Sequence, residues 1–197
     1  MKTGLYFGSF NPIHIGHMAI ANYLIEFTDL QQIWFVVSPH NPLKEKASLL
    51  NDYQRLEMVH RAINDDPRFR ASDIEFSMPK PSYTIDTLTY LKEKYPHKEF
   101  SLIMGSDNLY YIHKWKNFTE LIKDYKIIVY PRPGYPMDRE KLQVLIDYKE
   151  QFEEVNAPLM EISSSFLRNA IKAGKNISHF LPEDVFNYID EMNFYKK

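Results

Sequence analysis

The chain has 197 residues, of which 44% are hydrophobic and 25% are charged, and its formal net charge is -2. These values are ordinary for a globular protein with a buried core, and the length fits one domain over residues 1–197. The small net charge excludes a broadly basic surface for nucleic acid, so a phosphate site would have to come from local geometry.

No cysteine is present, which excludes disulfides, a thiol nucleophile and zinc sites built on sulfur. The first residues lack the charged and apolar regions of a signal peptide, and no run reaches the roughly 18 apolar residues of a membrane span. We therefore expect a cytoplasmic protein with no membrane partner. A homo-oligomer stays open, because an aromatic fraction of 15% fits a core, a lid or an interface equally well.

Short apolar runs alternate along the chain with segments of helical periodicity. Strands are predicted at Leu5–Phe7, Ile33–Val37, Phe100–Met104 and Ile127–Tyr130. Helices are predicted at His17–Phe27, Asp52–Asn64, Ser82–Lys94, Ser164–Lys172 and Pro182–Glu191. This alternation predicts an α/β fold with a Rossmann-like, doubly wound parallel sheet and a small helical part at the C-terminal end, from about residue 160. The highly charged segment 134–156 is interpreted as a helical insertion.

The first functional motif directly follows the first predicted strand. It reads Gly8-Ser9-Phe10-Asn11-Pro12-Ile13-His14-Ile15-Gly16-His17. In an α/β sheet the turn between a strand and the next helix faces the ligand crevice, and a helix start offers free N–H groups to phosphate oxygens. His14 and His17 are three residues apart, so both imidazoles can face one ligand. A single histidine at this place would more often be a cap or a surface residue.

This motif resembles the Gly-x-Phe-x-Pro-x-His-x-Gly-His signature of the nucleotidyltransferase superfamily, which shares its catalytic core with class I aminoacyl-tRNA synthetases. In nucleotidyl transfer an oxygen attacks the α-phosphorus of ATP while pyrophosphate leaves. Catalysis then rests mainly on positioning and on stabilising the charge of the phosphate oxygens. Histidines that donate hydrogen bonds to the phosphates would serve that reaction.

The second motif opens a predicted helix and reads Ile162-Ser163-Ser164-Ser165-Phe166-Leu167-Arg168. Helix capping would explain one of the serines, whereas three hydroxyls beside a guanidinium could surround an anion, and the residues alone leave both explanations open. The motif resembles the Ile-Ser-Ser-x-x-x-Arg motif of the same superfamily, which holds the β- and γ-phosphates. No Lys-Met-Ser-Lys-Ser type loop or RNA-binding appendage is visible, so the resemblance favours a free-standing transferase.

Four further segments narrow the choice of the second substrate. They are Pro39–Lys44, Pro81–Thr87, Met104–Asp107 with the nearby Trp115, and Tyr130–Tyr135. Each also has an ordinary structural explanation: a solvated lysine, a capped helix start, an N-capping aspartate with a buried tryptophan, and a surface ion pair of Arg132, respectively.

Together these segments resemble the bacterial nicotinate-nucleotide adenylyltransferases over nearly the whole chain. The resemblance implies transfer of AMP from ATP to nicotinate mononucleotide, giving deamido-NAD and pyrophosphate in NAD biosynthesis. It implies that His14, His17, Lys44 and Arg168 are catalytic. The implied ATP-binding residues are Gly8, Ser9, Phe10, His14, His17, Gly105, Asp107, Ser163, Ser164 and Arg168. The implied mononucleotide-binding residues are Ser38, Tyr83, Thr84, Trp115 and Arg132.

Two positions depart from the family pattern: Asn11 stands where aspartate is frequent, and Leu43 stands where histidine is common. The alternatives are an adenylyltransferase for nicotinamide mononucleotide or phosphopantetheine, and a nucleotide-binding protein without turnover. The expected cofactor is Mg²⁺ held through ATP phosphates and water, with no dedicated metal ligands from the protein.

Overall fold

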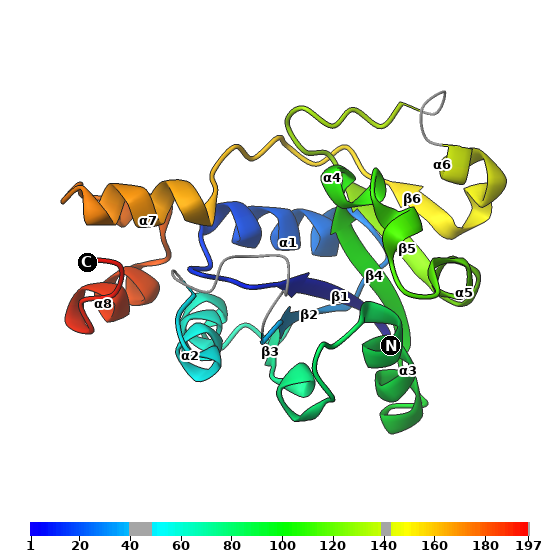
Figure 1. Cartoon of the computed structure of the whole chain (residues 1–197), viewed down its shortest axis with the longest axis horizontal. Coiled ribbons are helices and arrows are strands. Elements are labelled where there is room, and N and C mark those ends of the chain that lie inside the picture. Colours follow the sequence, from blue (N-terminus) through cyan, green and yellow to red (C-terminus); the bar gives the residue numbers. More distant parts are fainter. Residues whose placement is uncertain (40–48, 139–142, 197) are drawn as a thin grey trace.

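The computed structural model describes residues 1–39, 49–138 and 143–196. Within these ranges six strands form one parallel sheet in the order β3-β2-β1-β4-β5-β6 (Figure 1). The strands are β1 Lys2–Gly8, β2 Gln32–Val37, β3 Phe69–Ser72, β4 Glu99–Gly105, β5 Lys126–Tyr130 and β6 Phe152–Glu154. The α-helices are α1 Ile15–Phe27, α2 Asp52–Ile63, α3 Thr84–Lys94, α4 Ser106–Leu109, α5 Phe118–Asp124, α6 Gln143–Asp147, α7 Ser164–Lys172 and α8 Glu183–Glu191. Short 3-10 helices lie at Ile74–Ser77, Ile112–Lys114, Lys149–Gln151 and Ser178–Phe180.

The strand order places the functional motifs at one edge of the sheet. The chain builds outward from β1 through β2 to β3 and then crosses back to place β4 on the other side of β1. In open parallel sheets ligands bind where this reversal occurs, outside the carboxyl ends of the strands. Gly8 pairs with Val37, and Gly105 pairs with Tyr130, so the carboxyl ends of four neighbouring strands lie along one edge.

Each central strand buries side chains on both faces of the sheet. On β1, Leu5 belongs to one hydrophobic cluster and Tyr6 to the other, as expected when successive side chains point to opposite faces. Residues of α1, α2, α7 and α8 complete the cluster around Tyr6. Residues of α3 and α5 complete the cluster around Leu5. This two-sided covering confirms the predicted doubly wound α/β fold.

The two helices at the C-terminal end belong to the same core. Leu167 of α7 and Val185 and Ile189 of α8 are buried in the cluster that includes Tyr6. In Figure 1, α7 lies beside the start of α1, and α8 packs against α2. The motif that opens α7 is therefore held next to the turn that follows β1.

The predicted element boundaries need several corrections. Helix α1 begins at Ile15 instead of His17, and α3 begins at Thr84 instead of Ser82. Strand β3 was not predicted, because Phe69–Ser72 has only four residues and exposes Arg70. The interpretation of segment 134–156 as a helical insertion is wrong in part, because Phe152–Glu154 is an edge strand of the sheet. In the described ranges, no helix has the length and apolar character needed to cross a membrane.

Candidate active site

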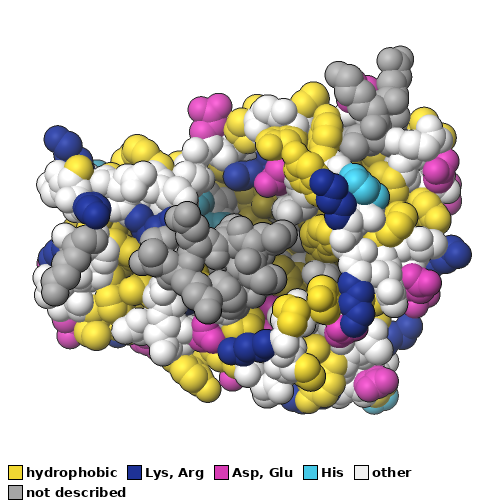
Figure 2. Space-filling view, in the orientation of Figure 1, with side chains coloured by type: hydrophobic (Ala, Val, Ile, Leu, Met, Phe, Trp, Pro, Cys, Tyr) yellow, Lys and Arg dark blue, Asp and Glu magenta, His cyan; other side chains and the backbone are white. Residues whose placement is uncertain are grey.

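A cavity of about 580 Å³ opens at the carboxyl end of β1 and is bounded by the start of α7. Both sequence motifs line it, and so do Asp107 and Arg132; we call it the histidine cavity. The ATP-binding residues predicted from the sequence that line it are Gly8, Ser9, Phe10, His14, His17, Asp107, Ser163, Ser164 and Arg168. Figure 2 shows a hollow in the middle of this face of the molecule, with basic, acidic and histidine side chains near its edge.

The turn after β1 is tightly packed and conformationally unusual. A Cβ atom at Gly8 would lie 2.8 Å from the ring of Phe10, so a larger residue at this position would displace that ring. Phe10 is buried and has a φ of 44°, in the left-handed region that residues with a side chain rarely adopt. Such strained residues persist where the surrounding structure fixes them, often at functional sites. The close packing here directs the following residues toward the start of α1.

The two histidines stack against one another at the start of α1. Their ring centroids are 3.8 Å apart, and the backbone N–H of His14 donates a hydrogen bond to Nδ1 of His17 at 3.2 Å. Because Nδ1 of His17 accepts this bond, a neutral His17 carries its proton on Nε2. That N–H is then a donor for a ligand in the cavity.

Both histidines are neutral at physiological pH. Burial lowers the pKa of His14 to about 4, with a smaller contribution from the positive charge of Arg132. Burial also lowers the pKa of His17 well below its ordinary value, with His14 and Arg132 acting in the same direction. The His14 side chain faces the backbone N–H of His17 in a capping-box arrangement at the start of α1, and its Nδ1 is buried.

The three serines of the second motif have different structural roles. Ser163 is the N-cap of α7, and its hydroxyl accepts a hydrogen bond from the N–H of Phe166 at 3.2 Å. The Ser164 hydroxyl donates to the carbonyl of Pro12 at 2.9 Å, which ties α7 to the first motif. The Ser165 hydroxyl is exposed and accepts from Arg168. Capping thus accounts for one serine, while all three line the histidine cavity.

Arg168 joins the two motifs directly. Its Nη1 donates to the carbonyl of Asn11 at 2.8 Å, and its Nη2 donates to Ser165 at 3.2 Å. The guanidinium therefore lies at the wall of the cavity with a fixed orientation. A planar guanidinium held in this way presents a fork of N–H donors suited to phosphate oxygens.

Asn11 holds the first motif to the rest of the site. Its Oδ1 accepts from the N–H of Leu50 at 3.3 Å and from the hydroxyl of Tyr195 at 2.7 Å. Tyr195 is near the C-terminal end of the chain, and burial raises the pKa of its hydroxyl, so the group stays protonated as a donor. With asparagine instead of aspartate at position 11, the side-chain oxygen still connects the first motif to Leu50 and to Tyr195.

Asp107 and Arg132 follow adjacent strands and lie close together. Nε of Arg132 lies 3.8 Å from Oδ1 of Asp107, and the backbone N–H of Arg132 donates to Ser106. Gly105 is not among the lining residues of the histidine cavity in the described part of the chain. It lies beneath this pair, because a Cβ atom there would collide with both side chains. Arg132 lines the histidine cavity, whereas the sequence grouped it with the mononucleotide-binding residues.

A second cavity of about 550 Å³ lies beside the first, and we call it the tryptophan cavity. Four of the residues predicted to bind the mononucleotide line it: Ser38, Tyr83, Thr84 and Trp115. Phe7 and Asn108 line both cavities, so the two share a boundary near the carboxyl end of β1. The start of α3 forms one wall, where the first N–H groups of the helix have no partner within it.

Two buried charged residues near the cavities were missed in the sequence. Glu75 lines the tryptophan cavity and accepts a hydrogen bond from the Thr87 hydroxyl at 2.8 Å. Burial raises the pKa of Glu75, against hydrogen bonds from Thr87, Ser38 and Ser82 that favour the carboxylate. Arg55 is fully buried beneath the turns that follow β1 and β2. Nothing in the local sequence marks Glu75, but Arg55 lies on the apolar face of α2 at four-residue spacing from Val59, which is a readable signal.

Lys44, predicted to be catalytic, and Leu43 lie outside the described residues. In the described part of the chain no three histidine, aspartate or glutamate residues come close enough to hold a metal ion together. The acidic residue at the histidine cavity is Asp107, which already faces Arg132.

The family model described as cytidylyltransferase-like matches residues 5–170 of the chain. A protein of Flavobacterium johnsoniae named a probable nicotinate-nucleotide adenylyltransferase is 54% identical over 197 residues, which cover 100% of both chains. A protein of the same name from Bacteroides fragilis is 48% identical over 188 residues, covering 95% of this chain and 90% of its own. The chain belongs to the nicotinate-nucleotide adenylyltransferase family.

Solved structures of this enzyme class share the fold. A Plasmodium falciparum nicotinic acid mononucleotide adenylyltransferase complexed with NaAD superimposes with a TM-score of 0.83 at 23% identity, over 99% of this chain and 97% of its own. The nucleotidyltransferase fold and the family expected from the sequence motifs are thereby confirmed.

Proposed function

We propose that the chain joins the AMP part of ATP to nicotinate mononucleotide, with ATP in the histidine cavity and the mononucleotide in the tryptophan cavity. The observation that carries this proposal is the shared boundary of the two cavities at Phe7 and Asn108. Two substrates bound side by side bring the phosphate of one next to the α-phosphorus of the other. Holding the reactants in this way contributes a large part of the rate in phosphoryl chemistry.

The reaction that these residues support is a displacement at phosphorus. A phosphate oxygen of the mononucleotide attacks the α-phosphorus, the bond from that phosphorus to the bridging oxygen breaks, and pyrophosphate leaves with the electron pair. No strong general base is needed, because the attacking phosphate is already ionised near neutral pH. The Nε2–H of His17 is a donor for the charge that develops on the α- and β-phosphate oxygens.

The wall of the histidine cavity that the start of α7 forms suits the terminal phosphates of ATP. Ser165 and Arg168 offer a hydroxyl and a guanidinium at the start of α7, where the helix dipole also favours negative charge. We therefore assign this wall to the β- and γ-phosphates.

The tryptophan cavity suits a pyridine ring that bears a carboxylate. Trp115 is half-buried and offers an aromatic face on which the ring can stack. The first N–H groups of α3 and its dipole favour the carboxylate of the nicotinate. A nicotinamide has one oxygen that can accept from these N–H groups and carries no negative charge, whereas the carboxylate has two accepting oxygens, so we propose a preference for the acid.

Members of the nucleotidyltransferase family generally use a divalent metal ion together with ATP. We propose Mg²⁺ for this chain, bound through ATP phosphate oxygens and water, because Mg²⁺ retains several waters and commonly binds to proteins through substrate phosphates. The ion would neutralise charge on the leaving pyrophosphate. We also propose a cytoplasmic location, for which the lack of cysteine and the use of ATP are the support.

The assignment of the two substrates can be tested through their KM values. Replacing Trp115→Ala should raise the KM for nicotinate mononucleotide about tenfold, since stacking on one aromatic ring is worth roughly 1–3 kcal/mol, and should leave the KM for ATP within about twofold. Trp115→Phe is the matched control, because it keeps an aromatic face. Arg168→Lys should do the reverse and raise mainly the KM for ATP. An equal rise of both KM values in Trp115→Ala would refute the assignment of separate cavities.

A further inference from the structure

Arg55 has a fully buried side chain in which every guanidinium N–H group is used. An arginine has five such donors, and burying its charge is costly unless these are satisfied. Nε donates to the carbonyl of Leu50 at 3.1 Å. The other bonds run from Nη1 to the carbonyls of Ser9 at 2.7 Å and Ser38 at 2.8 Å, and from Nη2 to the carbonyl of Pro39 at 3.1 Å and to Oδ1 of Asp52 at 2.6 Å.

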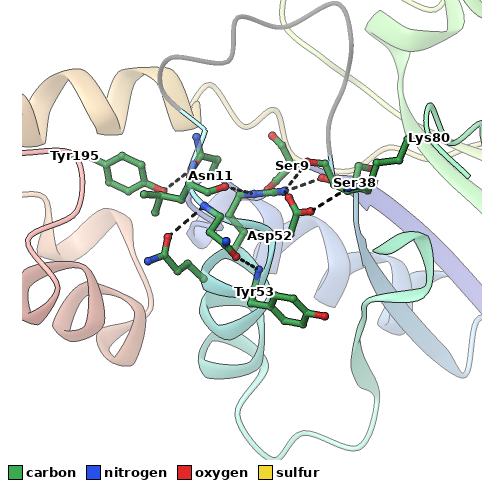
Figure 3. A network of polar contacts seen from close by, with 12 residues as sticks. Ser9, Asn11, Ser38, Asp52, Tyr53, Lys80 and Tyr195 are labelled. Atoms are coloured by element: carbon green, nitrogen blue, oxygen red, sulfur yellow. Dashed lines mark hydrogen bonds and ion pairs between the residues drawn. The ribbon is translucent and has the colours of Figure 1, made fainter. Parts of the chain in front are cut away.

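These bonds connect the walls of the two cavities. Ser9 lies in the turn after β1 and lines the histidine cavity, whereas Ser38 lies in the turn after β2 and lines the tryptophan cavity. A single nitrogen, Nη1 of Arg55, holds a carbonyl from each turn. Figure 3 shows Ser9, Ser38 and Asp52 gathered around one point of this network.

The network continues toward the start of α3. Oδ2 of Asp52 lies 3.8 Å from Nζ of Lys80, which immediately precedes Pro81 at the rim of the tryptophan cavity. Figure 3 shows Lys80 beyond Asp52 on this side, and Asn11 and Tyr195 on the other. The same group of contacts thus reaches segments that border both cavities.

We propose that Arg55 is a positioning residue for adenylyl transfer. It fixes the turn after β1, which borders ATP, relative to the turn after β2, which borders the mononucleotide. This proposal rests on the function proposed above. Arg55 does not bind either substrate, because it is fully buried and all its donors are engaged within the protein. Its effect is on the distance between the attacking phosphate and the α-phosphorus.

General energetics favour this role over a purely stabilising one. A buried ion pair is often no more stable than apolar side chains of similar volume, because the desolvation of the charges offsets their attraction. What an arginine offers here and an apolar residue cannot is a planar set of donors that fixes four carbonyl groups in one geometry. A displacement of about 1 Å between reacting groups is enough to lower a rate about 100-fold.

The test compares Arg55→Lys with wild type in turnover and in binding. Lysine keeps the charge but has three donors on one atom, so it cannot hold both turns. We expect kcat to fall about 100-fold, while the Kd of nicotinate mononucleotide and that of a non-hydrolysable ATP analogue, each measured alone by calorimetry, stay within about threefold. Arg61→Lys is the matched control on the same helix, since Arg61 bonds the partly exposed Glu57 and lines neither cavity; it should leave kcat unchanged.

A second variant covers the case in which Arg55→Lys does not fold. Asp52→Asn keeps an oxygen that can accept from Nη2 but removes the charge that faces Arg55 and Lys80. It should lower kcat about tenfold with the two Kd values retained. The proposal is overturned if the variants lose thermal stability while kcat stays within about twofold of wild type, or if the loss lies in the Kd of one substrate. Failure of wild type to turn over in the same assay would instead overturn the proposed function.

Discussion

His14 and His17 lie against each other at the start of α1, and burial lowers the pKa of both. In the free protein they are therefore uncharged donors instead of cations. This arrangement avoids repulsion between two imidazolium rings 3.8 Å apart. It leaves the positive charge at the site to the arginine side chains.

The low pKa of His14 predicts a specific loss of stability in acid. An unfolded histidine has a pKa near 6.5, whereas His14 in the folded protein has a pKa of about 4. Between these two pH values the unfolded state binds a proton at this residue and the folded state does not. The contribution of His14 to the unfolding free energy is therefore fully present above about pH 6.5 and is lost as the pH drops toward 4. This residue alone should cost about 2.5 kcal/mol of unfolding free energy between about pH 7 and pH 4.5.

Urea unfolding of wild type and His14→Asn at these two pH values measures this contribution. The variant should lose about 2.5 kcal/mol less than wild type on acidification, although it can be less stable at pH 7. His60→Asn, at an exposed position of α2, is the control and should lose as much as wild type. Equal acid losses in wild type and His14→Asn would show that His14 titrates normally.

At the level of single residues, the sequence predicted the cavity-lining residues that belong to a short motif. The histidines, the serines and Arg168 could be predicted because their spacing belongs to a short contiguous pattern. Glu75 could not, because its partner Thr87 is separated from it by twelve residues and comes close only through folding. Arg132 lines the histidine cavity although the sequence grouped it with the mononucleotide-binding residues, because the sequence predicts its strand but not the direction of its side chain toward Asp107.

At the scale of elements, α7 begins with three serines that the structure distinguishes. Ser163 caps the helix, and loss of an N-cap hydroxyl typically costs about 1 kcal/mol. Ser165 is exposed and bonds only the side chain of Arg168 among the contacts of the described chain. Of the two explanations that the sequence left open, capping therefore applies to Ser163, and Ser165 is the serine that we propose for anion binding.

Two alanine variants separate these roles. Ser163→Ala should lower the unfolding free energy by about 1 kcal/mol, measured by urea denaturation. Ser165→Ala should leave stability within about 0.5 kcal/mol and should raise the KM for ATP several-fold. If Ser165→Ala left the KM for ATP unchanged, this serine would not contact the terminal phosphates.

The strands also show where sequence patterns succeed and fail. The central strands were predicted because burial on both faces requires a continuous apolar run, as in Ile33–Val37. The edge strands β3 and β6 lack such runs, because an edge strand is only partly covered. β6 consists of one phenylalanine and two glutamates, and it can be recognised as a strand only from its pairing with β5.

At the scale of the whole molecule, the sheet order decides where chemistry occurs. Reversal of the strand order around β1 brings the turn after β1, the residues after β4 and β5, and the start of α7 to one edge. The tryptophan cavity adjoins the histidine cavity at the end of β1. The turn after β2, which pairs with β1, and the start of α3 form its other walls. Two sites that share a wall suit a reaction that joins two nucleotides.

The most direct test of this account is the rate of pyrophosphate release by wild type from ATP and Mg²⁺ with three acceptors measured in parallel. These are nicotinate mononucleotide, nicotinamide mononucleotide and phosphopantetheine. We expect nicotinate mononucleotide to give the highest kcat/KM, by about tenfold or more, with one dinucleotide formed for each pyrophosphate released. A higher kcat/KM for another acceptor would contradict the assignment of the tryptophan cavity to nicotinate. Binding of ATP with no pyrophosphate release from any acceptor would contradict the account as a whole.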